Sequence, residues 1–131
     1  IWAAFRVQPN HDPEALRAVA RASLAFRKQT QPLASPSAGC IFQNPQSPRD
    51  TLPEGMPASA GALVDRAGLK GRAIGGARVS DAHANFIVND GTATAHDVAA
   101  LIELCRATVA ERFGVTLRDE IVRLGAWLER G

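Results

Sequence analysis

The stretch from Thr94 to Gly114 constrains the fold of this 131-residue chain more than any other. Thr94 is a favourable N-cap residue, and Asp97 stands three positions later, where an acidic side chain completes a capping box. Gly114 follows the last apolar position, as glycine often does at helix ends. The apolar positions in between keep helical spacing: Val98, Leu101, Ile102, Cys105, Val109 and Phe113. We therefore expect a long helix with one face packed against a core.

The segments around this helix predict shorter elements. Ser59 caps a helix over 60–67 that Gly68 ends. Short apolar runs predict strands at 41–42, 72–74, 86–88 and 120–124, and a tail follows at 125–131. Gly75 and Gly76, after the second run, fit either a bend where two strands cross or a nest of backbone N–H groups for an oxygen anion. Helices mixed with short strands in this order predict the α+β class.

The first part of the chain has a different character. Residues 1–7 predict a strand that begins without any lead-in, as if it belonged to a larger sheet. Asp12 then caps a helix over 13–28, with Pro13 at the first helical position, where its missing N–H is harmless. Proline, serine and alanine are frequent over 29–38, which predicts a linker into a second domain.

Composition excludes several classes of protein. The formal charge of +2, from 15 basic and 13 acidic residues, is too small for a nucleic-acid-binding stripe. No apolar run approaches the roughly 20 residues that span a bilayer, so we expect no membrane partner. The 2 cysteines form no disulfide framework, and no spacing of cysteine, histidine or acidic residues suggests a metal site. We expect reduced thiols in a cytoplasmic protein.

The run 36–45 is the most informative for chemistry, because it places a thiol, Cys40, directly after a glycine in a loop of small residues. Gly39 has no Cβ, so a ligand can approach the backbone closely there. Gln43 and Asn44 offer amide donors to a polar ligand. Taken alone, the Gly-Cys pair also fits a small, buried structural cysteine.

Two further blocks, 68–89 and 113–125, follow this run along the chain. In their order and spacing, the three blocks resemble the carboxy-terminal region of the UDP-N-acetylenolpyruvoylglucosamine reductase (MurB) family, over about 27–125. The resemblance implies that a flavin-binding domain with a glycine-rich phosphate-binding motif precedes this region, and no such motif occurs here. We therefore expect the carboxy-terminal half of a longer enzyme. Residues 1–28 would end its FAD-binding domain, and 29–131 would form its substrate-binding domain.

The resemblance also implies a reaction. Enzymes of this family reduce UDP-N-acetylglucosamine enolpyruvate to UDP-N-acetylmuramate, for peptidoglycan synthesis in the cell wall. NADPH reduces FAD, and the reduced flavin passes hydride to the terminal carbon of the enol ether. Negative charge then develops on the carbon beside the carboxylate, so the protein must supply a proton donor and stabilise that charge.

Two residues match the catalytic positions of the family. Cys40 stands where most members have a proton-donating serine, and a thiol is the stronger acid and remains mostly protonated at neutral pH. Glu120 matches the catalytic glutamate, which could polarise the substrate carboxylate if a desolvated site keeps it protonated. Asp119 beside it leaves the register open by one residue, and Val122 stands where the family usually has an arginine, with Arg123 following. Cys40 could also be an inert buried residue, and Glu120 an exposed acid at the start of a strand.

Other residues match positions that bind the substrate in the family. Asn44 corresponds to an asparagine at the diphosphate, and Lys70 to a lysine between two glycines, which allow phosphate to approach closely. His83 and Asn85 fall where members place groups near the substrate, although His83 fits a surface histidine equally well. Contacts to FAD and NADPH are expected mainly in the preceding domain.

Two other functions remain open. The chain could be a nucleotide-sugar binding module without catalysis, with a UDP-sugar as its partner. It could also sense redox conditions through Cys40, but this requires a depressed thiol pKa, and no basic residue adjoins Cys40 in the sequence.

Overall fold

A computed structural model describes residues 2–6 and 12–125 of the chain. The chain divides into two compact units, residues 1–30 and residues 31–131, which are described separately. None of the helices that the structure describes has the length and apolar character that crossing a membrane requires.

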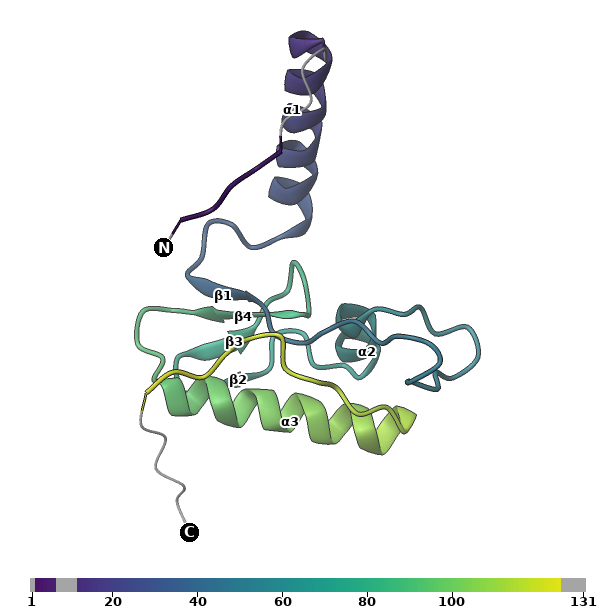
Figure 1. Cartoon of the computed structure of the whole chain (residues 1–131). Coiled ribbons are helices and arrows are strands. Elements are labelled where there is room, and N and C mark those ends of the chain that lie inside the picture. Colours follow the sequence, from purple (N-terminus) through teal and green to yellow (C-terminus); the bar gives the residue numbers. More distant parts are fainter. Residues whose placement is uncertain (1, 7–11, 126–131) are drawn as a thin grey trace. The chain divides into compact units, whose positions relative to one another are not determined.

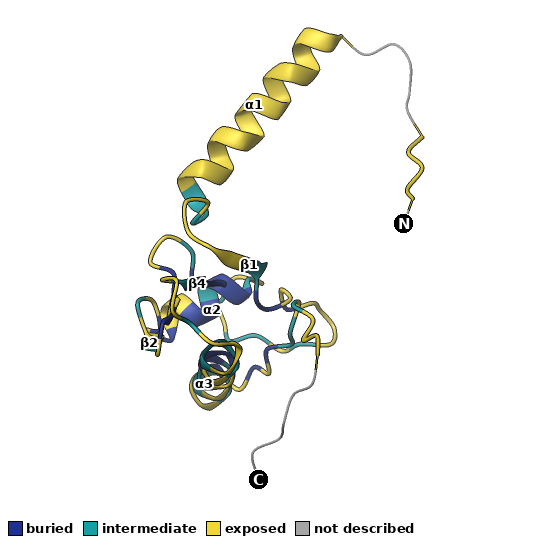
Figure 2. Ribbon diagram, turned by 90° about the vertical axis from the view of Figure 1, so that its left-hand side faces the viewer, coloured by how far each residue is buried: buried dark blue, intermediate teal, exposed yellow. Residues whose placement is uncertain are grey.

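The first unit contains helix α1 (Pro13–Thr30). It begins as expected, since the Asp12 carboxylate accepts a hydrogen bond from the Glu14 N–H at 2.9 Å, and it continues slightly beyond the predicted end at residue 28. None of its residues is buried, and Val19 and Phe26 on its apolar side are 69% and 65% exposed. Figure 2 shows this exposure along the helix.

The strand predicted for 1–7 is wrong where the structure describes it, because residues 2–6 adopt no regular secondary structure. A strand requires a neighbouring strand to satisfy its N–H and C=O groups, and no strand pairs with these residues in the described part of the chain. The other residues of this prediction lie outside the described residues.

The second unit is built on a four-stranded antiparallel sheet with strand order β1-β4-β3-β2. Its strands are β1 (Ser37–Cys40), β2 (Ala73–Ile74), β3 (Ala77–Val79) and β4 (Phe86–Asn89). Figure 1 shows α3 (Ala95–Phe113) running along one side of this sheet, and α2 (Ala60–Arg66) stands at one end of it. The predicted α+β class is correct for this domain.

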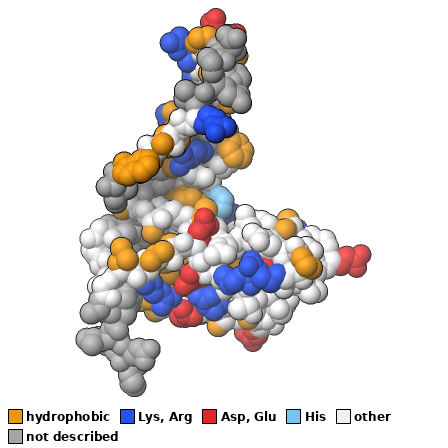
Figure 3. All heavy atoms as spheres, viewed as in Figure 1, with side chains coloured by type: hydrophobic (Ala, Val, Ile, Leu, Met, Phe, Trp, Pro, Cys, Tyr) orange, Lys and Arg blue, Asp and Glu red, His pale blue; other side chains and the backbone are white. Residues whose placement is uncertain are grey.

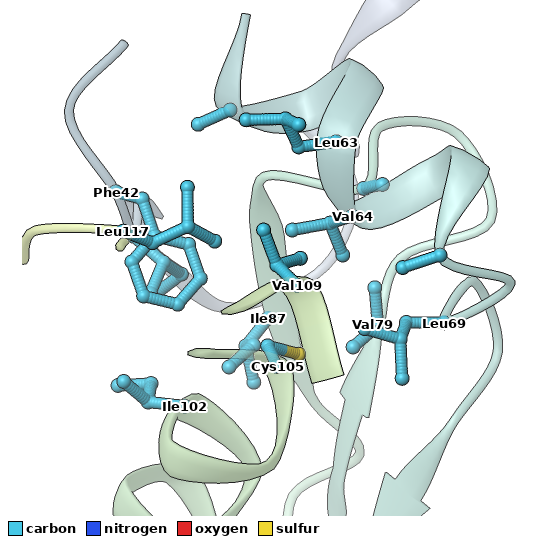
Figure 4. Packing of buried hydrophobic residues seen from close by; sticks show 14 of the residues in the cluster. Phe42, Leu63, Val64, Leu69, Val79, Ile87, Ile102, Cys105, Val109 and Leu117 are labelled. Carbon is cyan, nitrogen blue, oxygen red and sulfur yellow. The ribbon is translucent and has the colours of Figure 1, made fainter. Parts of the chain in front are cut away.

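Helix α3 forms as its sequence predicts. Thr94 and Asp97 make the reciprocal hydrogen bonds of a capping box, and Gly114 ends the helix in a left-handed conformation with φ of 66°. Its buried residues are Leu101, Ile102, Cys105 and Val109. They join a core to which α2 contributes Leu63 and Val64 and which also includes the fully buried Phe42 and Leu117 (Figure 4).

Gly75 and Gly76 form the turn of a hairpin between β2 and β3, so the expected crossing of two strands is wrong. Strand β3 gave little sequence signal, because it has only the three residues Ala-Arg-Val. A Cβ on Gly75 would lie 2.5 Å from the Asp97 carboxyl group, so only glycine fits at this close approach to α3. Hydrogen bonds from Thr94 and from the Gly76 backbone lower the pKa of Asp97.

Two predicted strands are displaced or absent. The strand expected at 41–42 lies directly before these residues, as β1. Ile41 and Phe42 are nevertheless buried, as expected. The strand expected at 120–124 does not form, and Asp119 alone makes an antiparallel bridge, to Phe42. Continued pairing would run toward Gly39, where β1 has φ of +92° and an irregular register. A bulge bends a strand away from a straight partner, so the pairing stops.

Candidate functional site

Asn85 organises the centre of the candidate site. It is 3% exposed, and its side-chain oxygen accepts a hydrogen bond from the Phe42 N–H at 2.9 Å. Its amide nitrogen donates to the Phe42 carbonyl at 2.8 Å, and its backbone carbonyl accepts from Ile41 at 2.9 Å. These bonds connect Asn85, which directly precedes β4, to the two residues that follow Cys40, and they hold both the N–H and the C=O of Phe42.

Cys40 is the last residue of β1 and is half-buried. Burial raises the pKa of its thiol, the negative charge of Glu120 raises it further, and a hydrogen bond with the Asn85 side chain opposes both. The thiol is therefore protonated at neutral pH. A redox sensor needs a depressed thiol pKa, and Cys40 has the opposite shift.

Glu120 and Asp119 have different surroundings, which bears on the register left open by the sequence. Asp119 is paired with Arg106 at 2.6 Å and with Arg123 at 3.4 Å. Glu120 is exposed and lines an open cavity of about 440 Å³ together with Gln43, Asn44 and Gln46. The carboxyl group available to a ligand is therefore that of Glu120.

Asn44 connects this cavity to helix α2. Its side-chain oxygen accepts a hydrogen bond from the Ala60 N–H, the first residue of α2, at 2.9 Å. The next residue, Gly61, packs against His83, since a Cβ on Gly61 would lie 3.0 Å from the imidazole Cε1. The start of α2 thus lies between Asn44 and His83.

His83 and Lys70 line a second hollow, of about 190 Å³, which Ser59 and Gly61 also border. The His83 Nδ1 accepts a hydrogen bond from the Asn85 N–H at 3.2 Å. Burial lowers the pKa of His83, and the positive charge of Lys70 lowers it further, so the ring is neutral at pH 7. Lys70 pairs with Asp65 at 2.7 Å on a partly exposed surface.

Of the residues singled out from the sequence, Asn44 and Glu120 line the first hollow, and Lys70 and His83 line the second. Asn85 contacts both Cys40 and His83, Glu120 acts electrostatically on Cys40, and Lys70 acts on His83. Asn44 is linked to His83 indirectly, because it accepts a hydrogen bond from Ala60 and the next residue, Gly61, packs against His83. The amide of Asn85 is fully engaged inside the protein, whereas the side chains of Asn44, Lys70 and Glu120 are at the surface.

Sequence reasoning did not single out Gln46, which borders the cavity beside Glu120. Gln46 belongs to a segment rich in proline, from Pro45 to Pro57. Asp50 fixes that segment, because it accepts hydrogen bonds from the Gln46 N–H at 2.8 Å and from the Arg118 side chain. The hydrogen bond from Arg118 is also the main reason why the pKa of Asp50 is lowered. No local sequence signal predicts this contact between distant segments.

Comparison with known proteins shows the family to which the chain belongs. Residues 31–124 match the profile of the C-terminal domain of UDP-N-acetylenolpyruvoylglucosamine reductase. The chain is 46% identical over 125 residues to the reductase of that name from Synechococcus sp. strain WH7803, covering 95% of this chain and 37% of that protein. It is 52% identical over 114 residues to the one from Desulfosudis oleivorans, covering 87% of this chain and 34% of the relative.

A solved structure is also similar. The crystal structure of UDP-N-acetylenolpyruvylglucosamine reductase from Thermus caldophilus matches with a TM-score of 0.54 and 39% identity. The match covers 79% of this chain and 33% of that one. This chain therefore spans little more than a third of the length of the relatives it matches.

Proposed function

The chain belongs to the UDP-N-acetylenolpyruvoylglucosamine reductase family, in which it matches the C-terminal domain, and we propose that it forms the substrate half of such an enzyme. The complete enzyme would reduce UDP-N-acetylglucosamine enolpyruvate to UDP-N-acetylmuramate, in peptidoglycan synthesis in the cytoplasm. Its hydride would come from FAD reduced by NADPH. The observation that supports this most is the pairing of a protonated, half-buried thiol with a carboxyl group beside an open cavity.

The described residues do not themselves fit either cofactor. Dinucleotides bind where a glycine-rich turn opens a helix, and no described helix begins in this way. The thiol, carboxyl, amide and ammonium groups of the site suit a substrate with carboxylate and phosphate groups instead. We therefore assign the contacts to FAD and NADPH mainly to the flavin domain that would precede the substrate-binding domain.

Cys40 has the properties of the proton donor. Once hydride has been added to the terminal carbon of the enol ether, the Cys40 S–H bond would break and its proton would form a C–H bond beside the carboxylate. The thiolate left behind would regain a proton from water. A raised pKa keeps the thiol loaded at neutral pH, and the fixed backbone of Phe42 limits how far it can move.

Glu120 would stabilise the enolate from the cavity that it lines with Gln43 and Asn44. A substrate lying over this exposed carboxyl would exclude water and favour its protonated form, which can donate to the substrate carboxylate. Asn44 and Lys70 would bind the diphosphate, and neutral His83 would offer a ring nitrogen nearby. Asn85 would contribute to substrate binding indirectly, since its side chain holds Cys40 and Phe42.

The proposed division of the chain follows the same logic. Residues 29–131 would be the substrate-binding domain, and 1–28 the end of the FAD-binding domain. The apolar side of α1, with Leu16 and Val19 exposed, is what a helix taken from a larger packed domain would show. The missing flavin domain would then be the partner of this surface.

A reductase chimera tests the proposal. In this chimera, the matched segment of this chain replaces the corresponding segment of the Synechococcus sp. strain WH7803 reductase. We expect the chimera to oxidise NADPH only when UDP-N-acetylglucosamine enolpyruvate is added, and to form UDP-N-acetylmuramate. Folded, flavin-loaded chimera that binds the UDP-sugar without turnover would instead support a binding module without catalysis.

A further inference from the structure

The two catalytic candidates, Cys40 and Glu120, lie on segments that meet at a single short bridge. Phe42 pairs with Asp119, and the Glu120 N–H donates to the Ile41 carbonyl at 2.8 Å. The Gln43 N–H donates to the Arg118 carbonyl at 2.9 Å on the other side of that pair. Because the bridge does not continue into a strand, its few hydrogen bonds alone would leave the position of Glu120 poorly fixed.

Arg106 of α3 contacts both sides of this bridge. Its Nη2 donates to the Asp119 Oδ1 at 2.6 Å, and its Nη1 donates to the Leu117 carbonyl. Its guanidinium carbon lies 5.7 Å from the centre of the Phe42 ring, within the range of a cation–π interaction. Figure 3 shows acidic and basic side chains gathered over the part of the view where α3 and the segment after it lie.

The Glu103 side chain holds the arginine itself. Its Oε2 accepts from the Arg106 Nε at 3.0 Å, and its Oε1 accepts from Arg123 at 3.0 Å. The Arg106 side chain is 25% exposed, so water screens these contacts only in part. The forked guanidinium is needed, because the compact ammonium group of a lysine cannot reproduce this planar set of contacts.

We infer that Arg106 is a positioning residue: by holding Asp119 and Leu117 against Phe42, it fixes Glu120 on the segment that pairs with the residues after Cys40. This role rests on the proposed function for its importance in catalysis. It also explains why the two adjacent acidic side chains make different contacts. Asp119 is an anchor that faces the arginines, and Glu120 is the acid left to face the cavity.

The first test needs no catalysis. In the full 131-residue chain, the rate at which iodoacetamide alkylates Cys40 is followed from pH 7 to 11 by peptide mass spectrometry. Since the Glu120 carboxylate raises the thiol pKa, Glu120→Gln should shift the profile to lower pH and speed alkylation at pH 8 about twofold. Arg106→Ala should give the same shift, and the double variant no further shift. Arg112→Ala, on the exposed part of the same helix, is the matched control and should leave the profile unchanged.

A second test measures the role in catalysis. In the reductase chimera, Arg106→Ala should slow flavin reoxidation by the UDP-sugar about tenfold, leave flavin reduction by NADPH unchanged, and add little in a Glu120→Gln background. If Arg106→Ala melts below the assay temperature, Arg106→Lys serves in both tests.

The inference is overturned if Arg106→Ala leaves the alkylation profile unchanged, or if its effects persist in full without Glu120. It is also overturned if Glu120→Gln leaves that profile unchanged, since the charge of Glu120 would then not act on the thiol. An inactive chimera with the expected alkylation shifts would count against the proposed function only, and the positioning role would stand.

Discussion

The two thiols of the chain lie in two regions with opposite properties. Cys105 points from α3 into the core, is 1% exposed, and its pKa is raised by burial to about 11. Cys40 ends β1 at the edge of the sheet and is only half-buried, with Asn85 and Glu120 close enough to act on its proton. Apolar side chains surround Cys105, whereas polar groups near Cys40 change how readily its thiol ionises.

These two environments hold the proton of each thiol in different ways. In the core, only desolvation acts on Cys105, so its proton is held and no ligand can reach it. At the sheet edge, Glu120 favours the thiol, while Asn85 stabilises the thiolate that would remain after proton transfer. Cys40 thus keeps its proton at neutral pH and can still release it to a strong carbon base.

The largest expected effect is on catalysis. Cys40→Ala in the reductase chimera should slow flavin reoxidation by the UDP-sugar by about 10²- to 10⁴-fold, the usual contribution of a general acid. Reduction of the flavin by NADPH should continue at its normal rate. Cys105→Ala should leave both rates within a few fold of the parent. Stopped-flow absorbance at the flavin band separates the two steps, and full activity of Cys40→Ala would remove the proposed role of the thiol.

The next largest effect is on stability, and it concerns the hydrogen bonds that Asn85 makes near Cys40. Asn85→Ala should lower the free energy of unfolding of the chain by about 2–4 kcal/mol, because the buried N–H and C=O of Phe42 both lose their partner. Urea denaturation measures this loss.

Asn44→Ala is the matched control. It removes one hydrogen bond, to Ala60, at an exposed position, and should lower the free energy of unfolding by no more than about 1 kcal/mol. Equal losses for the two variants would contradict the central place given to Asn85.

Sequence reasoning succeeded where the signal is local. The capping box at Thr94, the glycine at 114 and the helical spacing around Cys105 predicted α3 and the burial of that thiol, and the structure confirms them. Each of these features depends on residues within a turn or two of one another, so the pattern of side chains carries it directly. Gly68 is another example, since it follows α2 with φ of +72°.

Sequence reasoning failed where the determinant lies far along the chain. The hydrogen bonds between Asn85 and Phe42 span 43 positions, and the pairing of Arg106 with Asp119 depends on where α3 lies. The apolar residues at 121–122 favoured a strand. Its partner would be β1, whose register is irregular between Ser37 and Cys40, so the strand does not form. The identity of the candidate site residues came from resemblance to a family, and their surroundings could be described only from the fold.

A third prediction uses the pH dependence of stability. Since burial raises the pKa of Cys105 from 9.0 to about 11, the folded chain keeps a proton that the unfolded chain loses between these pH values. The contribution of this proton to the free energy of unfolding is therefore fully present below pH 9. It is lost as the pH rises toward 11, and the free energy of unfolding falls by about 2–3 kcal/mol. Cys105→Ala should lack this part of the loss. Urea denaturation at pH 8 and 10.5 checks it, and a constant difference between the two proteins would contradict it.

The smallest expected effect distinguishes a thiol from a hydroxyl as proton donor. The raised pKa of Cys40 means that the parent chimera should keep its rate of flavin reoxidation at neutral pH and lose it as the thiol ionises at alkaline pH. Cys40→Ser should turn over within a few fold of the parent at pH 7, since the hydroxyl occupies the same place but is the weaker acid. Its rate should not show the alkaline loss, because a serine hydroxyl does not ionise in this range. The rate of flavin reoxidation from pH 7 to 10 gives both profiles. If the rates of the parent and of Cys40→Ser fell together at alkaline pH, another group would cause that loss. Cys40 would then resemble Cys105, whose proton is not used in catalysis.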